Sequence, residues 1–368
     1  MSAASLSASP SLAPEKDLAL NQPSRVSFMD VLRILACFMV IMVHSGEFFY
    51  IGPGDVIVRD HTYGTGVYGS ALRACVPLFV VASGYLLLPI REATGTFFRR
   101  RYTRVLVPFL LWSAVYVVYF HKYTDAIGLG QQLLLIGVNW TSGHLWFVYM
   151  LLGLYAFAPV ISPWLRAASA QEERWFLLAW GVTLLLPFVR LYFPKVWGEA
   201  FWNHIGGAYY FSGYLGYFVL GHYLRVHLRL GAARSRGLGL LLLGVGYGLT
   251  YWGFASRLPW ARTLPELELT WAFPTFNVAL MTLGWYLLLK DLPLPSPRAQ
   301  QWLARLSQLS FGVYLAHILV LEQVHRLLAG VVPPGLAFIP VQALLTFLLA
   351  YGLVYLLSLL PRSRYLVG

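Results

Sequence analysis

Charge is scarce in this 368-residue chain: only 11% of its residues are charged, whereas an average soluble domain carries about 25%. Together with a hydrophobic content of 58%, this excludes a single soluble globular domain. Cysteine is nearly absent as well, since Cys37 and Cys75 are the only two. They form neither a disulfide framework nor a metal-binding pattern, and we interpret both as small core side chains, with no metal site expected. The chain also lacks a P-loop and a Rossmann glycine fingerprint.

The chain is rich in long hydrophobic segments. Its mean hydropathy is +0.63, and runs long enough to cross a bilayer, about 20 residues each, recur from residue 31 onwards. We therefore predict an all-α polytopic membrane protein, a bundle of about ten transmembrane helices. The expected spans are 31–50, 70–90, 105–121, 144–165, 175–194, 207–225, 237–255, 271–290, 309–330 and 339–360. Residues 1–27, rich in Ser, Ala and Pro, are predicted to be a disordered tail before a transmembrane domain over 28–368.

The lysines and arginines orient the predicted bundle. Eighteen of them fall in the tail, the even-numbered connections and the C-terminal end, against five in the opposite loops. By the positive-inside rule, both termini lie in the cytoplasm of a multi-pass plasma-membrane protein. Because the basic residues are dispersed over membrane-flanking loops, the net charge of +12 does not predict nucleic-acid binding.

The first span carries two ionisable residues, Arg33 and His44. Eleven helical steps of about 100° place both on one helix face, about 16 Å apart along the axis. Such residues inside a membrane are costly and tend to face an interior pathway, which makes the pair a functional candidate. The alternative is that Arg33 anchors the helix at the membrane surface and His44 is a hydrogen-bonded core residue.

Five segments, in order, resemble the family-3 membrane acyltransferases, which O-acylate cell-surface polysaccharides. They are the Arg33 to His44 spacing on the first span, VPLFVVASGYLL at 76–87, the R-x-x-R and proline of FFRRRYTRVLVP at 97–108, the HLW of 144–146, and LSFGVYLAHILV at 309–320. The resemblance covers nearly the whole membrane region. It implies the branch of about ten spans without the soluble SGNH-type hydrolase domain of many relatives, and it favours the functional interpretation of His44 and Arg33.

The resemblance implies an O-acyltransferase, most simply an O-acetyltransferase. Its donor would be cytoplasmic acyl-coenzyme A, acetyl-coenzyme A by default, and its acceptor an extracytoplasmic or lipid-linked glycan, with no tightly bound cofactor. An imidazole exchanges protons near neutral pH, so His44 would be the general base or would itself carry the acyl group. Arg33 would bind the donor or stabilise oxyanion charge, and Asp30 would orient Arg33 unless it only complements the helix N-terminus.

Four arginines, Arg99, Arg100, Arg101 and Arg104, form a cation cluster suited to the phosphates of coenzyme A. Arg101 and Arg104 match the family's R-x-x-R and share a face if their helix begins early. Topology control or contact with anionic lipid is the competing interpretation for all four.

The remaining candidates are supporting or acceptor-side residues. Ser310, Tyr314 and His317 make a stripe that would place His317 near His44, or simply bind helices together. His144 and Trp146 open the fourth span as acceptor-side residues or as part of the aromatic belt. Glu47, one turn after His44, could tune the imidazole. Ser83 and Tyr85 flank a glycine that would permit a close helix contact, and packing is their simpler role.

A transporter or flippase of a sugar-containing substrate is the alternative function. In it His44, Glu47, His317 and Glu322 would form a proton relay. The sequence shows no paired halves with matched broken helices, as many secondary transporters do, and the five segments favour the enzyme. The i, i+4 spacing of Glu322 and Arg326 predicts an ion pair.

Overall fold

The computed structural model describes residues 27–60, 62–120, 124–138, 140–193, 213–293, 296–331 and 337–368. Within these ranges the protein is all-α, with an isolated bridge between Ile51 and Ile57 in place of any strand. The helices are α1 (Ser27–Glu47), η1 (Pro53–Asp55), α2 (Thr62–Leu72), α3 (Cys75–Leu87), α4 (Thr94–Tyr119), α5 (Ala126–Leu135), η2 (Gly143–Leu145), α6 (Trp146–Ala167), α7 (Ala170–Thr183), α8 (Leu186–Tyr192), α9 (Tyr214–Val226), α10 (Ala232–Arg257), α11 (Leu264–Leu267), η4 (Leu269–Trp271), α12 (Phe276–Leu289), α13 (Pro297–Ala329), α14 (Phe338–Ser358) and α15 (Arg364–Val367).

Eight helical segments in the described residues are long and apolar enough to cross a membrane, which confirms a polytopic helical bundle. They match eight of the ten expected spans. The expected spans 175–194 and 207–225 correspond to the shorter helices α7, α8 and α9, and residues 194 and 207–212 lie outside the described part. The predicted tail also lies outside it, except that Ser27 begins α1.

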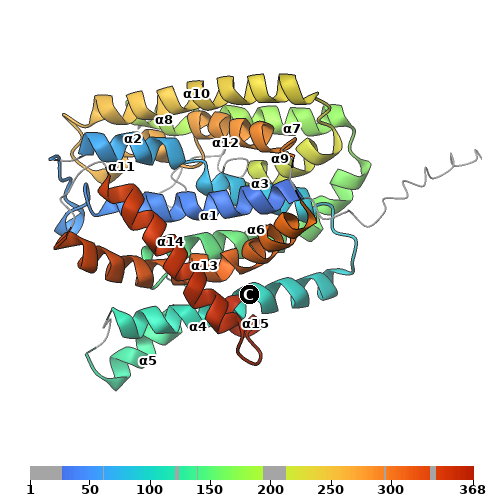
Figure 1. Cartoon of the computed structure of the whole chain (residues 1–368). Coiled ribbons are helices and arrows are strands. Elements are labelled where there is room, and N and C mark those ends of the chain that lie inside the picture. The colour runs from blue at the N-terminus through green and yellow to red at the C-terminus, as the bar shows by residue number, and fades with distance from the viewer. Residues whose placement is uncertain are drawn as a thin grey trace, which may run out of the picture.

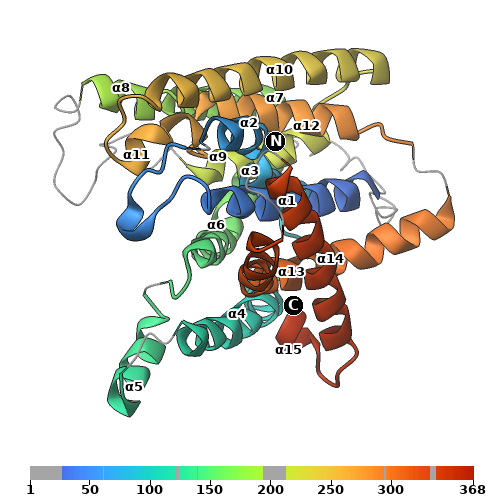
Figure 2. The same ribbon diagram turned by 60° about the vertical axis from the view of Figure 1, so that its left-hand side comes forward.

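Helix α1 runs through the middle of the bundle (Figures 1 and 2). It packs against α2, α3, α13 and α14, whereas α10 lies along one side of the molecule and α4 and α5 along the other. The outer helices turn large apolar side chains outward, as lipid-facing surfaces require; Leu240, Leu241 and Trp252 of α10 are each more than half exposed. The helix predicted to carry the key residues therefore lies inside the bundle, with other helices packed around it.

Two helices begin earlier than the apolar pattern predicted. The helix α4 starts at Thr94, eleven residues before the expected span, so Arg101 and Arg104 do lie in one helix. The helix α13 starts at Pro297 because Ser296 caps it, its Oγ accepting the Ala299 N–H at 3.2 Å. In both cases the first turns are polar, so hydrophobicity alone cannot locate the helix start.

The crossing of α3 and α9 depends on two glycines. A Cβ atom on Gly84 would lie 1.9 Å from the Phe218 carbonyl oxygen, and one on Gly221 would lie 2.2 Å from the Val81 oxygen. The two backbones touch where no side chain fits, which is how small residues pack membrane helices. This is the close helix contact expected at the SGY segment.

Candidate active site

Three histidines from distant parts of the chain meet inside the bundle. His44 comes from α1, His144 from η2 at the start of α6, and His317 from α13. The ring centroid of His317 lies 5.3 Å from that of His44 and 4.9 Å from that of His144, and the His44 and His144 centroids are 6.4 Å apart. His144 and His317 are buried, whereas the His44 side chain is 18% exposed. The fold therefore brings both distant histidines to His44.

Hydrogen bonds orient these rings. His44 Nδ1 lies 2.9 Å from a carboxylate oxygen of Glu47, so Nδ1 donates and Nε2 remains the basic nitrogen when the ring is neutral. His317 Nδ1 donates to the Tyr314 carbonyl at 2.5 Å, and His144 Nδ1 faces Ser142 Oγ at 2.9 Å. The Nε2 atoms of His144 and His317 have no hydrogen-bond partner among the described residues. A buried unpaired nitrogen costs about 1–3 kcal/mol, so two of them beside His44 point to chemistry or a ligand.

A cavity of about 200 Å³ adjoins His44; we call it the histidine cavity. Its polar lining is His44, Glu47, Arg73, His144 and Glu268, and its aromatic lining is Trp146, Phe147, Phe273 and Tyr314. Trp146 stacks on Phe273 with centroids 5.8 Å apart. Acid–base groups and a flat aromatic wall thus line one space.

A second cavity, of about 270 Å³, lies toward the N-terminal end of α1; we call it the arginine cavity. Arg33, Arg101 and Arg104 line it together with Tyr155 and Ser310. Ser83 also lines it, with its hydroxyl donating to the Phe79 carbonyl at 2.8 Å. The Nε atom of Arg101 is buried and has no partner among the described residues. The space therefore collects three cations, one of which has a buried nitrogen without a hydrogen-bond partner.

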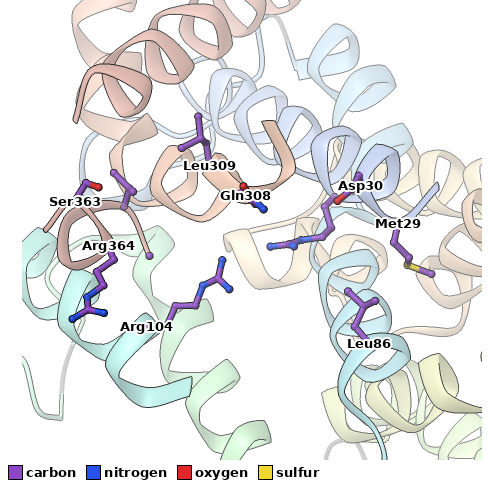
Figure 3. A pocket seen from close by; sticks show the side chains of 11 residues that line it. Met29, Asp30, Leu86, Arg104, Gln308, Leu309, Ser363 and Arg364 are labelled. Atoms are coloured by element: carbon purple, nitrogen blue, oxygen red, sulfur yellow. The ribbon is translucent and has the colours of Figure 1, made fainter. Parts of the chain in front are cut away.

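An outer hollow of about 510 Å³ shares Arg33, Leu86 and Arg104 with the arginine cavity. Figure 3 shows Arg104 on α4 facing across this hollow, with Asp30 and Leu86 on the opposite side and Ser363 and Arg364 beside Arg104. The C-terminal segment is fixed there because Trp112 Nε1 donates to the Leu366 carbonyl at 3.0 Å. The arginine cavity therefore opens through a basic vestibule.

Phe147 and Tyr314 line both the histidine cavity and the arginine cavity. Their rings pack edge to face at 5.3 Å, and the Tyr314 hydroxyl donates to the His144 carbonyl. Phe147 and Tyr314 therefore form a wall that is common to the two cavities. Arg33 lies on one side of that wall and His44 on the other.

Some predicted residues lie outside these cavities. Arg99 and Arg100 are exposed, and Arg100 pairs with Glu92 at 2.7 Å. Tyr85 packs against Phe28 and Tyr286 instead of lining either cavity.

A family model described as an acyltransferase domain, of the family-3 type, matches residues 26–361. The chain belongs to the family-3 acyltransferases. No curated protein and no solved structure matches the chain. The resemblance in the five sequence segments is thereby confirmed, and the class of reaction, acyl transfer, follows from the family.

Sequence reasoning missed three cavity residues of this acyltransferase. Tyr155 reaches the arginine cavity from α6, and no sequence signal distinguishes it from other span tyrosines. Arg73 and Glu268 line the histidine cavity, and neither belongs to the five segments that carry the family resemblance. Arg73 did carry a signal, since it is an ionisable residue inside the predicted span 70–90.

The transporter hypothesis needs Glu322 beside the histidines. In the structure Glu322 accepts a hydrogen bond from the Tyr119 hydroxyl at 2.9 Å and faces Arg326 at 3.7 Å, which confirms the predicted ion pair. Glu322 does not line the histidine cavity. The proton relay is therefore not assembled from the four residues it requires.

Proposed function

We propose that this acyltransferase moves an acetyl group from acetyl-coenzyme A in the arginine cavity to a glycan hydroxyl in the histidine cavity. The observation that carries the proposal is the pair of cavities sharing Phe147 and Tyr314, with cations in one and an oriented imidazole in the other. The acceptor is a cell-surface or lipid-linked saccharide. Acetyl-coenzyme A is a substrate, and the transfer needs no tightly bound cofactor.

The arginine cavity suits a polyanionic donor. Arg33, Arg101 and Arg104 present guanidinium groups, which hydrogen-bond phosphate oxygens in pairs. The vestibule adds Arg364 at its rim. The positive-inside orientation turns this end of the bundle, with its basic loops, toward the cytoplasm of a plasma-membrane protein.

His44 supplies the base. In the proposed step the thioester end of the donor passes Phe147 and Tyr314 to reach the acceptor in the histidine cavity. His44 Nε2 takes the proton of the acceptor hydroxyl while the hydroxyl oxygen attacks the thioester carbonyl carbon. The carbon–sulfur bond then breaks, and the imidazolium returns its proton to the leaving thiolate. The Glu47 carboxylate holds Nδ1 and stabilises the imidazolium, as a carboxylate does in other His-based sites. An acetyl-histidine relay is the alternative, and an acetyl adduct on His44 after exposure to acetyl-coenzyme A alone would identify it.

The function is tested on purified protein in detergent with acetyl-coenzyme A, by following free thiol with and without a glycan fraction from host membranes. We expect thiol release that depends on the acceptor and a matching acetyl mass added to the glycan. Release of thiol without any acetylated product, or no release at all, would contradict the proposed transfer.

The donor site has its own prediction. The double variant Arg101→Ala plus Arg104→Ala should raise KM for acetyl-coenzyme A by about 10²- to 10⁴-fold, since hydrogen bonds to charged groups contribute about 1.5–3 kcal/mol each and two such groups are removed. The matched control is Arg99→Ala plus Arg100→Ala, which removes the same charge from the same helix outside the cavity. We expect the control pair to raise KM for acetyl-coenzyme A much less. Equal effects of the two pairs would show that the arginines attract the donor only through their overall positive charge and do not form a specific binding site.

A further inference from the structure

Arg73 lies where the second membrane segment is broken. The helix α2 ends at Leu72 and α3 begins at Cys75, and Arg73 occupies the turn between them. The backbone at Ala74 stays close to helical dihedral angles, so the turn is a slight interruption, and Arg73 within it lines the histidine cavity. The break therefore places a cation in the wall of the space that holds His44.

The guanidinium of Arg73 is held rigidly yet incompletely bonded. Arg73 is 7% exposed, and its guanidinium carbon lies 4.0 Å from the centre of the Trp271 ring. Its Nε has no hydrogen-bond partner among the described residues. Stacking on an aromatic ring fixes the plane of a guanidinium without using its N–H donors. The Nε donor stays available to a ligand.

Trp271 is itself fixed on every side. Its indole N–H donates to Ser70 Oγ at 2.8 Å, and its ring stacks on Phe254 at 3.9 Å with an angle of 3° between the planes. The Tyr50 ring packs against it edge-on at 5.6 Å. The Tyr50 hydroxyl also donates to Glu268. One aromatic cluster thus positions both Arg73 and Glu268.

The charges of this space argue against an acidic ligand. Glu47 and Glu268 line the same cavity as Arg73, so one cation lies with two carboxylates. Vicinal sugar hydroxyls can accept from the guanidinium and donate to a carboxylate at once. The stacked rings of Trp146 and Phe273 offer an apolar face for a pyranose ring. An additional carboxylate or phosphate on the ring would meet two like charges.

We propose that Arg73 and Glu268 form the acceptor subsite, and that this subsite takes an uncharged, hydroxyl-rich hexopyranose in preference to an acidic one. The inference rests on the proposed function and names the acceptor class of the same site. Arg73 binds the acceptor and does not touch the donor, because it lines the histidine cavity and not the arginine cavity.

The test uses purified full-length protein, acetyl-coenzyme A, and the methyl glycosides of glucose, galactose and mannose. Each neutral sugar is compared with its uronate and with its uronamide. The uronamide is the decisive control, because it lacks the same C6 hydroxyl as the uronate but carries no charge. We expect transfer to neutral glycosides, and to uronamides at least tenfold faster than to uronates wherever C6 is not the acylated position.

Variants separate binding from structural effects. Arg73→Ala should raise KM for the acceptor about tenfold or more and leave KM for acetyl-coenzyme A within twofold. Arg73→Lys keeps the charge but loses the planar set of guanidinium N–H donors, so its KM for the acceptor should lie between those of wild type and Arg73→Ala. Added methylguanidine should partly restore acceptor binding in Arg73→Ala. Arg262→Ala, an exposed arginine outside the cavity, is the control for loss of a nearby charge.

Three results would overturn the inference: uronates used as well as uronamides, an unchanged acceptor KM in Arg73→Ala, or no transfer to any panel member while the host glycan fraction is still acetylated. Each leaves the proposed function standing. Failure of the wild-type protein to release thiol with any acceptor, host glycan included, would instead refute the proposed function.

Discussion

Replacing His44 with alanine should lower acceptor-dependent thiol release by about 10²- to 10⁴-fold, the usual contribution of a positioned general acid–base group. The loss should appear in kcat. Binding of coenzyme A, measured by calorimetry, should not change, because the arginines lie across the wall of Phe147 and Tyr314 from His44.

Two further variants sharpen the His44 result. Glu47→Gln keeps a hydrogen-bond acceptor near His44 Nδ1 but removes the charge that stabilises the imidazolium, so its kcat should fall between wild type and His44→Ala. His325→Ala is the matched control. It removes a histidine that faces Gln342 at 2.8 Å and stacks on Phe48, outside the histidine cavity. Activity of His44→Ala within tenfold of the His325→Ala control would exclude His44 as the base.

Adding one methyl group at Gly84 should destabilise the fold. In Gly84→Ala the new Cβ would meet the Phe218 carbonyl oxygen at 1.9 Å, so α3 and α9 must separate. Overpacking usually costs about 1–3 kcal/mol, and a backbone obstacle that cannot rotate away should reach the upper end. We expect a clear drop in the melting temperature of the detergent-solubilised protein, followed by intrinsic fluorescence.

The matched control for Gly84 is Gly153→Ala in α6, where nothing lies within 4 Å of the added atom. Alanine is the better helix former, so this variant should melt at or slightly above the wild-type temperature. Equal melting of the two variants would show that the α3–α9 crossing relaxes without cost.

The sequence was informative where one helix carried the signal. The eleven-residue spacing on α1 predicted a shared face, and Arg33 and His44 do line the two interior cavities. The proximity of His317 to His44 followed from depth in the membrane and is confirmed at 5.3 Å. Depth is readable from sequence because the apolar run marks where a span enters the membrane, even where the helix begins earlier, and the rise per residue is fixed.

The sequence was silent where the site depends on packing between distant segments. The break at Arg73 interrupts a continuous apolar run, so hydropathy predicted one unbroken helix over 70–90. Glu268 lies in a connection nearly 200 residues away from Arg73, and the hydrogen bond from the Tyr50 hydroxyl, which helps to place it in the cavity wall, joins segments far apart in the sequence. The sequence also could not distinguish Arg101 and Arg104, which line the arginine cavity, from the exposed Arg99 and Arg100. That distinction depends on the direction in which each side chain of α4 points.

The wall between the two cavities affects whether ions can leak through the protein across the membrane. A protein hollowed from both ends would dissipate ion gradients if the hollows joined into a water-filled pore. Phe147 and Tyr314 close that path with packed aromatic rings, and the Tyr314 hydroxyl is tied to the His144 carbonyl. On the proposed mechanism the acyl group passes this point bound to the donor sulfur, and His44 transfers the proton that the acceptor hydroxyl loses to the departing thiolate, so that uncharged reacting groups give uncharged products. Acylation can then proceed without a current across the bilayer.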